Sequence, residues 1–391
     1  MTKAPSALEI TQKLVQCPSV TPKEAGAMAY LDTLLSPLGF LVHRPVFTDQ
    51  GTPDVENLFA KISGGEGPHL TFAGHADVVP TGDETLWSVP PFAGEVRDGQ
   101  LYGRGTSDMK GGIGAFIAAV LKYIELHGEP HGTISLLITG DEEGPAINGT
   151  VKLMQWAADR GERFNDAIVG EPTNPEAMGD AIKIGRRGSQ SGTLTVMGQQ
   201  GHVAYPHLAH NPVPVLAKAV SCLSSAVLDH GTDHFQPTNL EFVSMDVGNE
   251  TWNLIPKAAS ARFNVRYNDL WDADKIADLV LSRAKESLPS EDFHVVLEME
   301  PAMSQAFLTR SEKLINGFSA AVAKVTGKMP EHSTDGGTSD ARFIKDYCPV
   351  IEFGLVGKTM HKIDEHIALD DLQTLSDIYY EYLMSYFPPQ G

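Results

Sequence analysis

Four apolar segments of this sequence each lead into side chains that can bind a metal ion. These side chains are His75 and Asp77 in LTFAGHADVVP, Asp141, Glu142 and Glu143 in TISLLITGDEE, Glu171 in DAIVGEP, and His361 in TMHKIDEH, shortly after PVIEFG. Ligands gather at the carboxyl ends of strands in open α/β sheets, so we expect these groups to meet at one edge. Asp108, in LYGRGTSDMKGG, precedes a helix and could join them.

Imidazole and carboxylate groups suit zinc, and also cobalt or manganese. A pair of ions about 3.5–4 Å apart would need one shared carboxylate, while a further acid stays free as a base. His75 and Asp77 lie on the same side of an extended strand, so Asp77 could accept the second ring N–H of His75. Glu142 and Glu143 point in opposite directions if extended, so one could ligate while its neighbour faces the attacking water.

Each of these residues also has an ordinary structural explanation. A histidine at a strand end is commonly a satisfied polar residue, and a Glu-Glu pair is commonly part of a solvated loop. Asp108 could serve only as the N-cap of the following helix. The combination favours the metal hypothesis, because an acid or an imidazole follows every one of these buried strands.

The elements that must position these residues alternate between strands and helices. Strands are predicted at residues 40–47, 57–62, 70–80, 133–143, 166–172 and 350–353, and helices at residues 7–16, 24–35, 112–126, 312–325 and 369–386. This alternation predicts an α/β fold with a mostly parallel sheet between helices.

A different pattern occupies the middle of the chain. Strands are predicted at residues 191–198, 238–247, 258–267 and 293–299, with helices at 212–228 and 271–288. The order β-α-β-β-α-β is typical of a ferredoxin-like domain. We therefore expect residues 1–182 and 300–391 to form a catalytic domain, and residues 183–299 to form an inserted α+β domain.

The composition excludes several classes of function. With 30 basic and 50 acidic residues the net charge is −20, which disfavours nucleic acid and anionic membranes as partners. Three widely spaced cysteines without a CxxC pair indicate an intracellular protein without a disulfide framework. The N-terminus has no apolar signal segment and the longest apolar run, about residues 113–121, is too short to span a membrane, so a cytoplasmic location is expected. Neither GxxxxGK[ST] nor GxSxG occurs.

Five motifs in order, GHADVVP, LYGRGTSDMKGG, GDEEG, GEPT and TMHKIDE, resemble those of the co-catalytic zinc amidohydrolases. That family includes aminoacylases, carboxypeptidase G-type enzymes, acetylornithine deacetylases and succinyl-diaminopimelate desuccinylases. The resemblance implies two Zn²⁺ per subunit, with Co²⁺ able to substitute, and a cis Asp108–Met109 peptide. The residue roles that it implies are His75 and Glu171 at one ion, His361 and Glu143 at the other, Asp108 between them, Glu142 as general base and Asp77 as the residue that orients His75.

The resemblance extends to the inserted domain, which would act as a lid and a dimerisation domain. It implies a homodimer in which His202, in GQQGHVAYPH, reaches the active site of the partner subunit. A small N-succinyl amino acid, N-succinyl-L,L-diaminopimelate, is the first expectation for the substrate, and N-acetylornithine or another N-acyl amino acid is the alternative. The candidate substrate contacts are Arg186, Ser189, Tyr205, Asn253, Arg266, Gly337 and Thr338. A role for Arg187 stays open.

Other interpretations of the lid residues and of the function of the whole chain also remain. An arginine on a lid is commonly a surface charge, and His202 could be a capping or interface histidine. STDGGTSD (residues 333–340) could be either a surface loop or a substrate-binding loop. A metal-dependent binding protein without catalysis is the alternative from another functional class.

Overall fold

The computed structural model describes residues 4–301 and 304–389, which divide into two compact units. The second unit comprises Gly185–Leu308 and Thr334–Thr338, and the first comprises the rest. The chain returns to the first unit later than residue 299, where the sequence placed the boundary. The reason is that β18 (Phe307–Leu308) pairs antiparallel with β11 (Gly185–Arg186). Thr334–Thr338 joins the second unit, where Arg186 Nη1 donates to the carbonyl oxygen of Asp335 at 3.0 Å.

The described part of the first unit contains an eight-stranded sheet in the order β1-β4-β8-β5-β9-β20-β10-β19. Its strands are β1 (Leu41–His43), β4 (Leu58–Ser63), β5 (His69–His75), β8 (Thr133–Thr139), β9 (Asp166–Val169), β10 (Ala181–Lys183), β19 (Glu331–Ser333) and β20 (Val350–Glu352). The central strands β8, β5, β9 and β20 are parallel, and antiparallel pairs join β4 on one side and β10 on the other. The prediction of an α/β fold with a mostly parallel sheet is confirmed.

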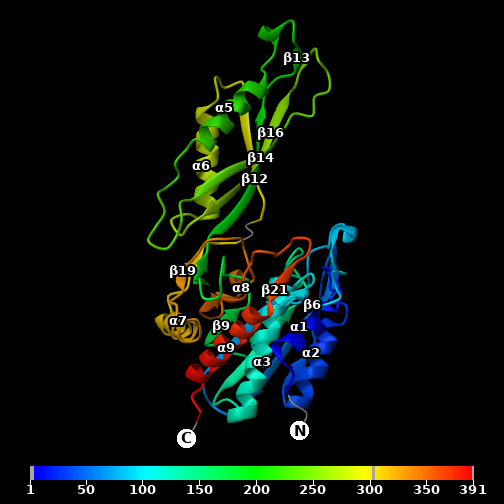
Figure 1. The fold of residues 1–391 in the computed structure, drawn as a ribbon. Coiled ribbons are helices and arrows are strands. Elements are labelled where there is room, and N and C mark those ends of the chain that lie inside the picture. Colours follow the sequence, from blue (N-terminus) through cyan, green and yellow to red (C-terminus); the bar gives the residue numbers. More distant parts are fainter. Residues whose placement is uncertain (1–3, 302–303, 390–391) are drawn as a thin grey trace. The chain divides into compact units, whose positions relative to one another are not determined.

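Helices cover both faces of this sheet (Figure 1). On one face the ring of Phe72 stacks on Phe116 of α3 (Gly111–His127) and meets Tyr379 of α9 (Leu369–Tyr386) edge-on. Phe59 on β4 aligns with Leu137 on β8, and Leu137 with Ala73, so Phe59 points to the opposite face from Phe72. There Phe59 contacts Trp156 of α4 (Thr150–Asp159).

The glycines at the start of α3 allow close packing. A Cβ atom on Gly112 would lie 2.5 Å from the carbonyl oxygen of Gly170, and one on Gly114 would lie 2.1 Å from Thr11 Oγ1 of α1 (Ala7–Val15). Because any side chain there would clash, these positions require glycine. The glycines therefore let α3 approach β9 and α1, which holds the segment carrying Asp108 against the sheet.

The second unit contains a four-stranded sheet in the order β14-β16-β12-β17. Its strands are β12 (Gly188–Met197), β14 (Asn239–Asp246), β16 (Ala258–Tyr267) and β17 (His294–Met299), and its helices are α5 (Pro212–Ser224) and α6 (Ala273–Glu286). All three strand pairs are antiparallel, in agreement with the predicted ferredoxin-like pattern. Leu194, Phe263 and Val280 belong to the core between sheet and helices.

The remaining elements are short or lie at the margins. They are α2 (Ala27–Leu35), α7 (Glu312–Thr326), α8 (Ala341–Ile344), η1 (Ser36–Leu38), η2 (Glu84–Leu86), η3 (Thr106–Lys110), η4 (Pro206–Leu208), β2 (Val46–Asp49), β3 (Thr52–Glu56), β6 (Glu95–Arg97), β7 (Gln100–Tyr102), β13 (Gly201–His202), β15 (Leu254–Ile255) and β21 (His366–Ala368). The sequence did not predict α4 or the β2–β3 hairpin, and the strand predicted at residues 40–47 is two strands, β1 and β2. All three cysteines are free. Among the described residues, no helix is both long and apolar enough to cross a membrane.

Candidate metal centre

The ligand candidates meet where strands of the large sheet end. His75 is the last residue of β5, Glu142 and Glu143 follow β8, and Glu171 follows β9. These strands are neighbours and parallel, so their carboxyl ends lie at one edge. Asp108 comes from η3, just before α3, and His361 comes from the loop between β20 and β21.

Asp108 lies between the two histidines. His75 Nε2 is 3.1 Å from Asp108 Oδ1 and 3.7 Å from Glu171 Oε1. His361 Nε2 is 3.2 Å from Asp108 Oδ2 and 2.9 Å from Glu143 Oε1. Each oxygen of Asp108 therefore faces a different imidazole, which is the arrangement that a carboxylate shared between two ions requires.

Three groups of potential ligands have atoms within 4.8 Å of one another: His75, Asp108 and Glu171; Asp108, Glu143 and His361; and His75, Glu142 and Glu143. The first two groups share Asp108, and together they contain the five residues predicted as ligands. Glu142 is absent from both of these groups. The geometry thus leaves Glu142 beside the centre as the additional acid.

The backbone around Asp108 departs from a regular helix. Asp108 and Met109 have non-helical dihedral angles inside η3, and the Asp108–Met109 peptide is cis, as the resemblance implied. The carboxylate of Glu365 accepts the backbone N–H groups of Ser107 and Asp108 at 2.9 and 3.3 Å. The backbone that carries Asp108 is thus held by a buried acid that the sequence did not single out.

Asp77 orients His75 through a different oxygen from the one expected. The Nδ1–H of His75 donates to the backbone carbonyl oxygen of Asp77 at 2.9 Å, whereas the Asp77 carboxylate is 3.7 Å away. That carboxylate accepts the backbone N–H groups of Glu142 and Glu143 at 3.2 and 3.1 Å. Since β5 ends at His75, Asp77 is not part of an extended strand. Its carboxylate instead holds the acidic loop beside the histidine.

The titration of these groups reflects their mutual contacts. Burial alone would lower the pKa of His75, but Asp108, Glu171 and Glu142 raise it well above its ordinary value. Hydrogen bonds to Asp108 and Glu143 raise the pKa of His361 to about 10. Burial, with Asp340, Glu143 and Asp108 as like charges, raises the pKa of Glu142 to about 8, although His75 opposes this.

The carboxylates of the centre lack cationic side-chain partners. In the described residues, none of Asp77, Asp108, Glu142, Glu143 and Glu171 forms an ion pair with lysine or arginine. Burying charges without opposite charges is costly. Two divalent cations would balance most of this negative charge, and the nitrogen and oxygen donors fit zinc-type ions.

Comparison with known proteins agrees with this chemistry. Residues 71–385 match the family described as peptidase family M20/M25/M40. The chain belongs to this family. A protein of Bradyrhizobium sp. (strain BTAi1 / ATCC BAA-1182) named succinyl-diaminopimelate desuccinylase is 56% identical over 382 residues, which cover 97% of this chain and 99% of that protein.

Two solved structures similar to this M20-family chain show the same fold. The aminopeptidase PepT from Bacillus cereus has a TM-score of 0.80, with 19% identity over 98% of this chain and 99% of its own. A dinuclear metal-binding peptidase of the M20 family from Bacillus subtilis has a TM-score of 0.72, with 14% identity over 98% of each chain.

The residues of this M20-family chain that were predicted to contact substrate form two groups within the second unit. His202, Tyr205 and Asn253 lie together: the His202 and Tyr205 rings are 5.7 Å apart, and the carbonyl oxygen of Asn253 accepts the N–H of Val203. All three are exposed. They lie past the end of β12, which begins at Gly188 and ends at Met197.

The other group lies near the start of β12. Ser189 is opposite Arg266 in the β12–β16 ladder, and Arg187 Nη1 donates to Asn239 Oδ1 at 3.0 Å. Burial and the charge of Arg187 lower the pKa of Arg266. Gly337 and Thr338 belong to the same unit, in the segment whose Asp335 accepts from Arg186. Ten residues of β12, rising about 3.3 Å each, separate the two groups by about 30 Å.

Two acids near the centre have roles that the sequence did not reveal. Asp141 accepts the backbone N–H groups of Ala146, Ile147 and Asn148 at 2.8–3.2 Å, so it organises a loop instead of joining the ligand groups. Asp340 is buried, accepts the hydroxyl of Thr150 at 2.7 Å and contributes to the raised pKa of Glu142. In the sequence, only the position of Asp340 in STDGGTSD indicated a functional role for this residue.

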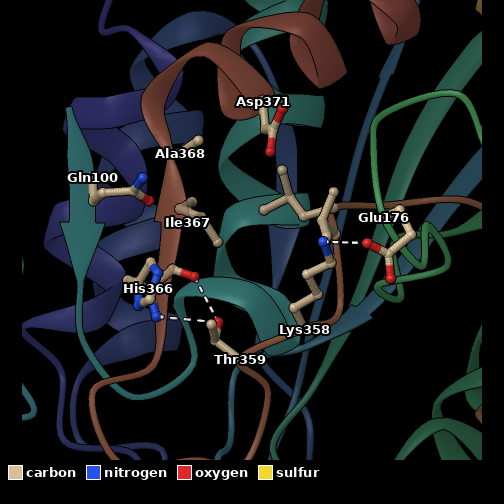
Figure 2. A pocket seen from close by; sticks show the side chains of 10 residues that line it. Gln100, Glu176, Lys358, Thr359, His366, Ile367, Ala368 and Asp371 are labelled. Carbon is tan, nitrogen blue, oxygen red and sulfur yellow. Dashed lines mark hydrogen bonds and ion pairs between the residues drawn. The ribbon is translucent and has the colours of Figure 1, made fainter.

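A cavity of about 190 Å³ lies beside the His361 loop and is separate from the ligand groups. Figure 2 shows Lys358 paired with Glu176 on one side of it and Asp371 on another. Thr359 and His366 also line this cavity and hydrogen bond to each other (Figure 2). This contact closes the base of the loop that carries His361.

Proposed function

We propose that the protein is a dinuclear metal amidohydrolase that converts N-succinyl-L,L-2,6-diaminopimelate and water to succinate and L,L-diaminopimelate. The 56% identity over 97% of the chain to a protein named succinyl-diaminopimelate desuccinylase carries the choice of substrate. The arrangement of two ligand groups around Asp108 supports the type of reaction. The product would serve the synthesis of diaminopimelate and lysine.

The geometry supports a proposal for the two ligand sets. His75, Glu171 and Asp108 would hold one ion, and His361, Glu143 and Asp108 would hold the other. We propose Zn²⁺ at both positions, with Co²⁺ able to replace it, since both accept imidazole and carboxylate ligands. When bound, such ions polarise the amide carbonyl and lower the pKa of a water molecule toward about 7.

Glu142 is the acid that neither ligand set needs, and we assign it as the general base. Burial is the main cause that raises its pKa above the usual range of a carboxyl group, which brings it nearer to neutral pH, as a general base requires. Glu142 would take a proton from the attacking water and then give it to the leaving amine. The backbone N–H of Glu142, bound to the Asp77 carboxylate, fixes the position of this residue.

His202 is suited to donate a hydrogen bond to the developing oxyanion. Its Nδ1 accepts the backbone N–H of Ala204 at 3.0 Å, so a neutral His202 carries its proton on Nε2. That N–H is a donor of the kind that stabilises a tetrahedral oxyanion. The contact with Ala204 argues against a role for His202 as a base through Nδ1.

We propose a homodimer that forms through the second unit. β14 pairs only with β16 and is an edge strand among the described residues, and its Val243 and Met245 are 67% and 51% exposed. Exposed edges of this kind pair readily with a second strand. His202 lies a full strand length beyond Gly185, where the chain passes into the second unit. His202 is exposed, and we propose that it acts on the substrate of the partner subunit.

The arginines near the start of β12 suit a substrate with several carboxylates. Arg187 and Arg266 interact as like charges, and Arg186 is 7% exposed. No hydrogen bond or ion pair of the Arg266 side chain occurs in the described part of the chain. We propose that Arg186 and Arg266 bind substrate carboxylates, with Ser189, Tyr205, Asn253, Gly337 and Thr338 as further contacts.

The test is hydrolysis of N-succinyl-L,L-diaminopimelate beside N-acetylornithine, with zinc-loaded protein and a chelated control. Metal-dependent preference for the succinyl substrate is the expected result. Preference for N-acetylornithine would reject the substrate and the arginine contacts but keep the metal centre. Tight binding of either compound by the metal-loaded protein without hydrolysis would instead support a binding protein.

Mixed dimers test the role of His202 in the partner's site. A dimer of one Glu142→Gln subunit and one His202→Ala subunit has one site with both defects and one with neither, if His202 acts on the partner. We expect such dimers to recover about half of the wild-type activity. If His202 acted within its own subunit, each site would keep one defect and activity would stay low.

A further inference from the structure

The loop that presents His361 has an unfavourable backbone conformation. His361 and Asp364 have φ values of +61° and +57°, a region that residues other than glycine seldom occupy. At its base, the Thr359 hydroxyl donates to the carbonyl oxygen of His366 at 2.6 Å and accepts the N–H of His366 at 3.2 Å (Figure 2). The conformation between these residues must therefore be held by further contacts.

Arg104 supplies contacts to this loop from its buried side. Its side chain is 2% exposed and follows β7. Nη1 donates to the carbonyl oxygen of Lys362 at 3.1 Å and to Glu365 Oε2 at 2.7 Å. Nη2 donates to the carbonyl oxygen of Pro80 at 3.3 Å and lies 3.5 Å from that of His361. A single guanidinium thus contacts the carbonyl oxygens of the consecutive residues His361 and Lys362.

Glu365 connects the same guanidinium to Asp108. Its side chain is fully buried. While Oε2 accepts from Arg104, Oε1 accepts the backbone N–H groups of Ser107 and Asp108 at 2.9 and 3.3 Å. The backbone carbonyl oxygen of Glu365 also accepts the N–H of Gly103 at 2.8 Å, beside the β21–β7 ladder. The segments of Asp108 and His361, some 250 residues apart, are therefore joined by one ion pair.

We propose that Arg104 and Glu365 are positioning residues for the half of the metal centre formed by Asp108, Glu143 and His361. Together they set the distance between the His361 imidazole and the shared carboxylate, which is 3.2 Å. Loss of this ion pair would weaken the ion on that side more than the ion held by His75, Asp108 and Glu171. This inference rests on the dinuclear centre of the proposed function.

Two conservative substitutions disrupt the hydrogen bonds of the ion pair with little change in the size of the side chain. Every partner of the Glu365 carboxylate is a donor, so in Glu365→Gln the amide NH₂ must face another N–H whichever way it turns. Arg104→Lys keeps the positive charge, but one ammonium cannot reproduce the fork that contacts the carboxylate and the carbonyl groups together. Glu162→Gln, in the Lys61–Glu162 ion pair of the same unit, is the matched control.

The experiment is calorimetric titration of the metal-free full-length protein with Zn²⁺, repeated with Co²⁺ while its visible absorption is recorded. Wild type should bind two ions, and His361→Ala identifies which step belongs to the His361 side. In Arg104→Lys and Glu365→Gln that step should weaken by about 10–100-fold, as for other residues that orient ligands, while the other step changes far less. The Co²⁺ spectrum of the weakened step should change, and Glu162→Gln should match wild type.

The possible outcomes separate this inference from the proposed function. If wild type binds fewer than two ions, the dinuclear centre itself is rejected. If wild type binds two ions and both variants do so with wild-type affinities, the positioning role is wrong. If both binding steps weaken equally, or if neither variant folds under the conditions in which wild type folds, the ion pair is a general structural contact. Either result would also overturn the proposal.

Discussion

Replacement of Glu142 by glutamine tests the assignment of the base most directly. The substitution keeps the size of the side chain and leaves the backbone N–H bound to the Asp77 carboxylate. No hydrogen bond of the Glu142 carboxylate to another side chain occurs in the described residues, so little structure depends on it. The cost of burying a charged carboxylate and its repulsion from Asp340, Glu143 and Asp108, which together raise the pKa of Glu142, both disappear. The folded protein should therefore be at least as stable as wild type.

The expected loss of activity follows from the one role that the substitution removes. An amide cannot accept the proton of the attacking water, and proton transfer by a positioned side chain contributes about 10²–10⁴-fold to a rate. At 1.36 kcal/mol for each factor of ten, this corresponds to roughly 3–5 kcal/mol of transition-state stabilisation. Neither ligand set includes Glu142, so both ions should still bind.

The assay combines kcat for N-succinyl-L,L-diaminopimelate with metal content measured on the same sample. Glu142→Gln should bind two ions and lose 10²–10⁴-fold in kcat, by the magnitude given above. Glu143→Gln is the informative comparison, because it should lose the ion on the His361 side as well as activity. Full kcat in Glu142→Gln would refute the assignment, and loss of an ion would show that Glu142 is a ligand.

Three further predictions concern the substrate, the pH dependence of stability and the core. Arg266→Gln should raise KM for the succinyl substrate by about 10–100-fold through loss of a charged hydrogen bond, whereas Arg262→Gln, an exposed arginine on the same strand, should not. Burial lowers the pKa of His69 from 6.5 to about 4, so between these pH values the imidazole binds a proton in the unfolded chain but not in the folded protein. The free energy of unfolding, measured by urea titration, should therefore fall by roughly 2 kcal/mol from pH 7 to pH 5. The variant His69→Gln should lack this decrease. Phe72→Ala, at a fully buried ring stacked 4.3 Å from Phe116, should cost about 3–5 kcal/mol of unfolding free energy.

Much of the fold could be predicted because the buried strands are short, apolar and regularly spaced. β5, β8 and β9 are almost completely buried, and runs of this kind are typical of parallel strands covered on both faces. α4 was missed although it packs against the sheet, since it follows the loop organised by Asp141 and has no capping side chain at its start. The boundary at Leu308 was also invisible, because the two-residue pair of β11 and β18 has no periodic pattern.

The candidate ligands could be predicted for a related reason. His75 ends β5, and Glu143 and Glu171 follow its parallel neighbours β8 and β9, so the strand pattern itself places all three at one edge. The contact between His75 and the carbonyl oxygen of Asp77 could not be predicted, because every residue type carries a backbone carbonyl oxygen. The role of Arg104 could not be predicted for the same reason, since three of its four acceptors are backbone carbonyl groups.

This difference divides the metal centre into two parts with different physical origins. The ligands that follow strands are positioned by the sheet, whose hydrophobic core is shared by the whole unit, so a mutation that displaces them should also lower global stability. Asp108 and His361 come from segments outside the sheet, and the Glu365 carboxylate and the Arg104 guanidinium join them through donors and acceptors of the backbone. Changes in that ion pair should therefore weaken the ion on the His361 side more than the ion on the His75 side. Conversely, Phe72→Ala should lower unfolding free energy while both ions bind to the folded fraction with nearly wild-type affinity.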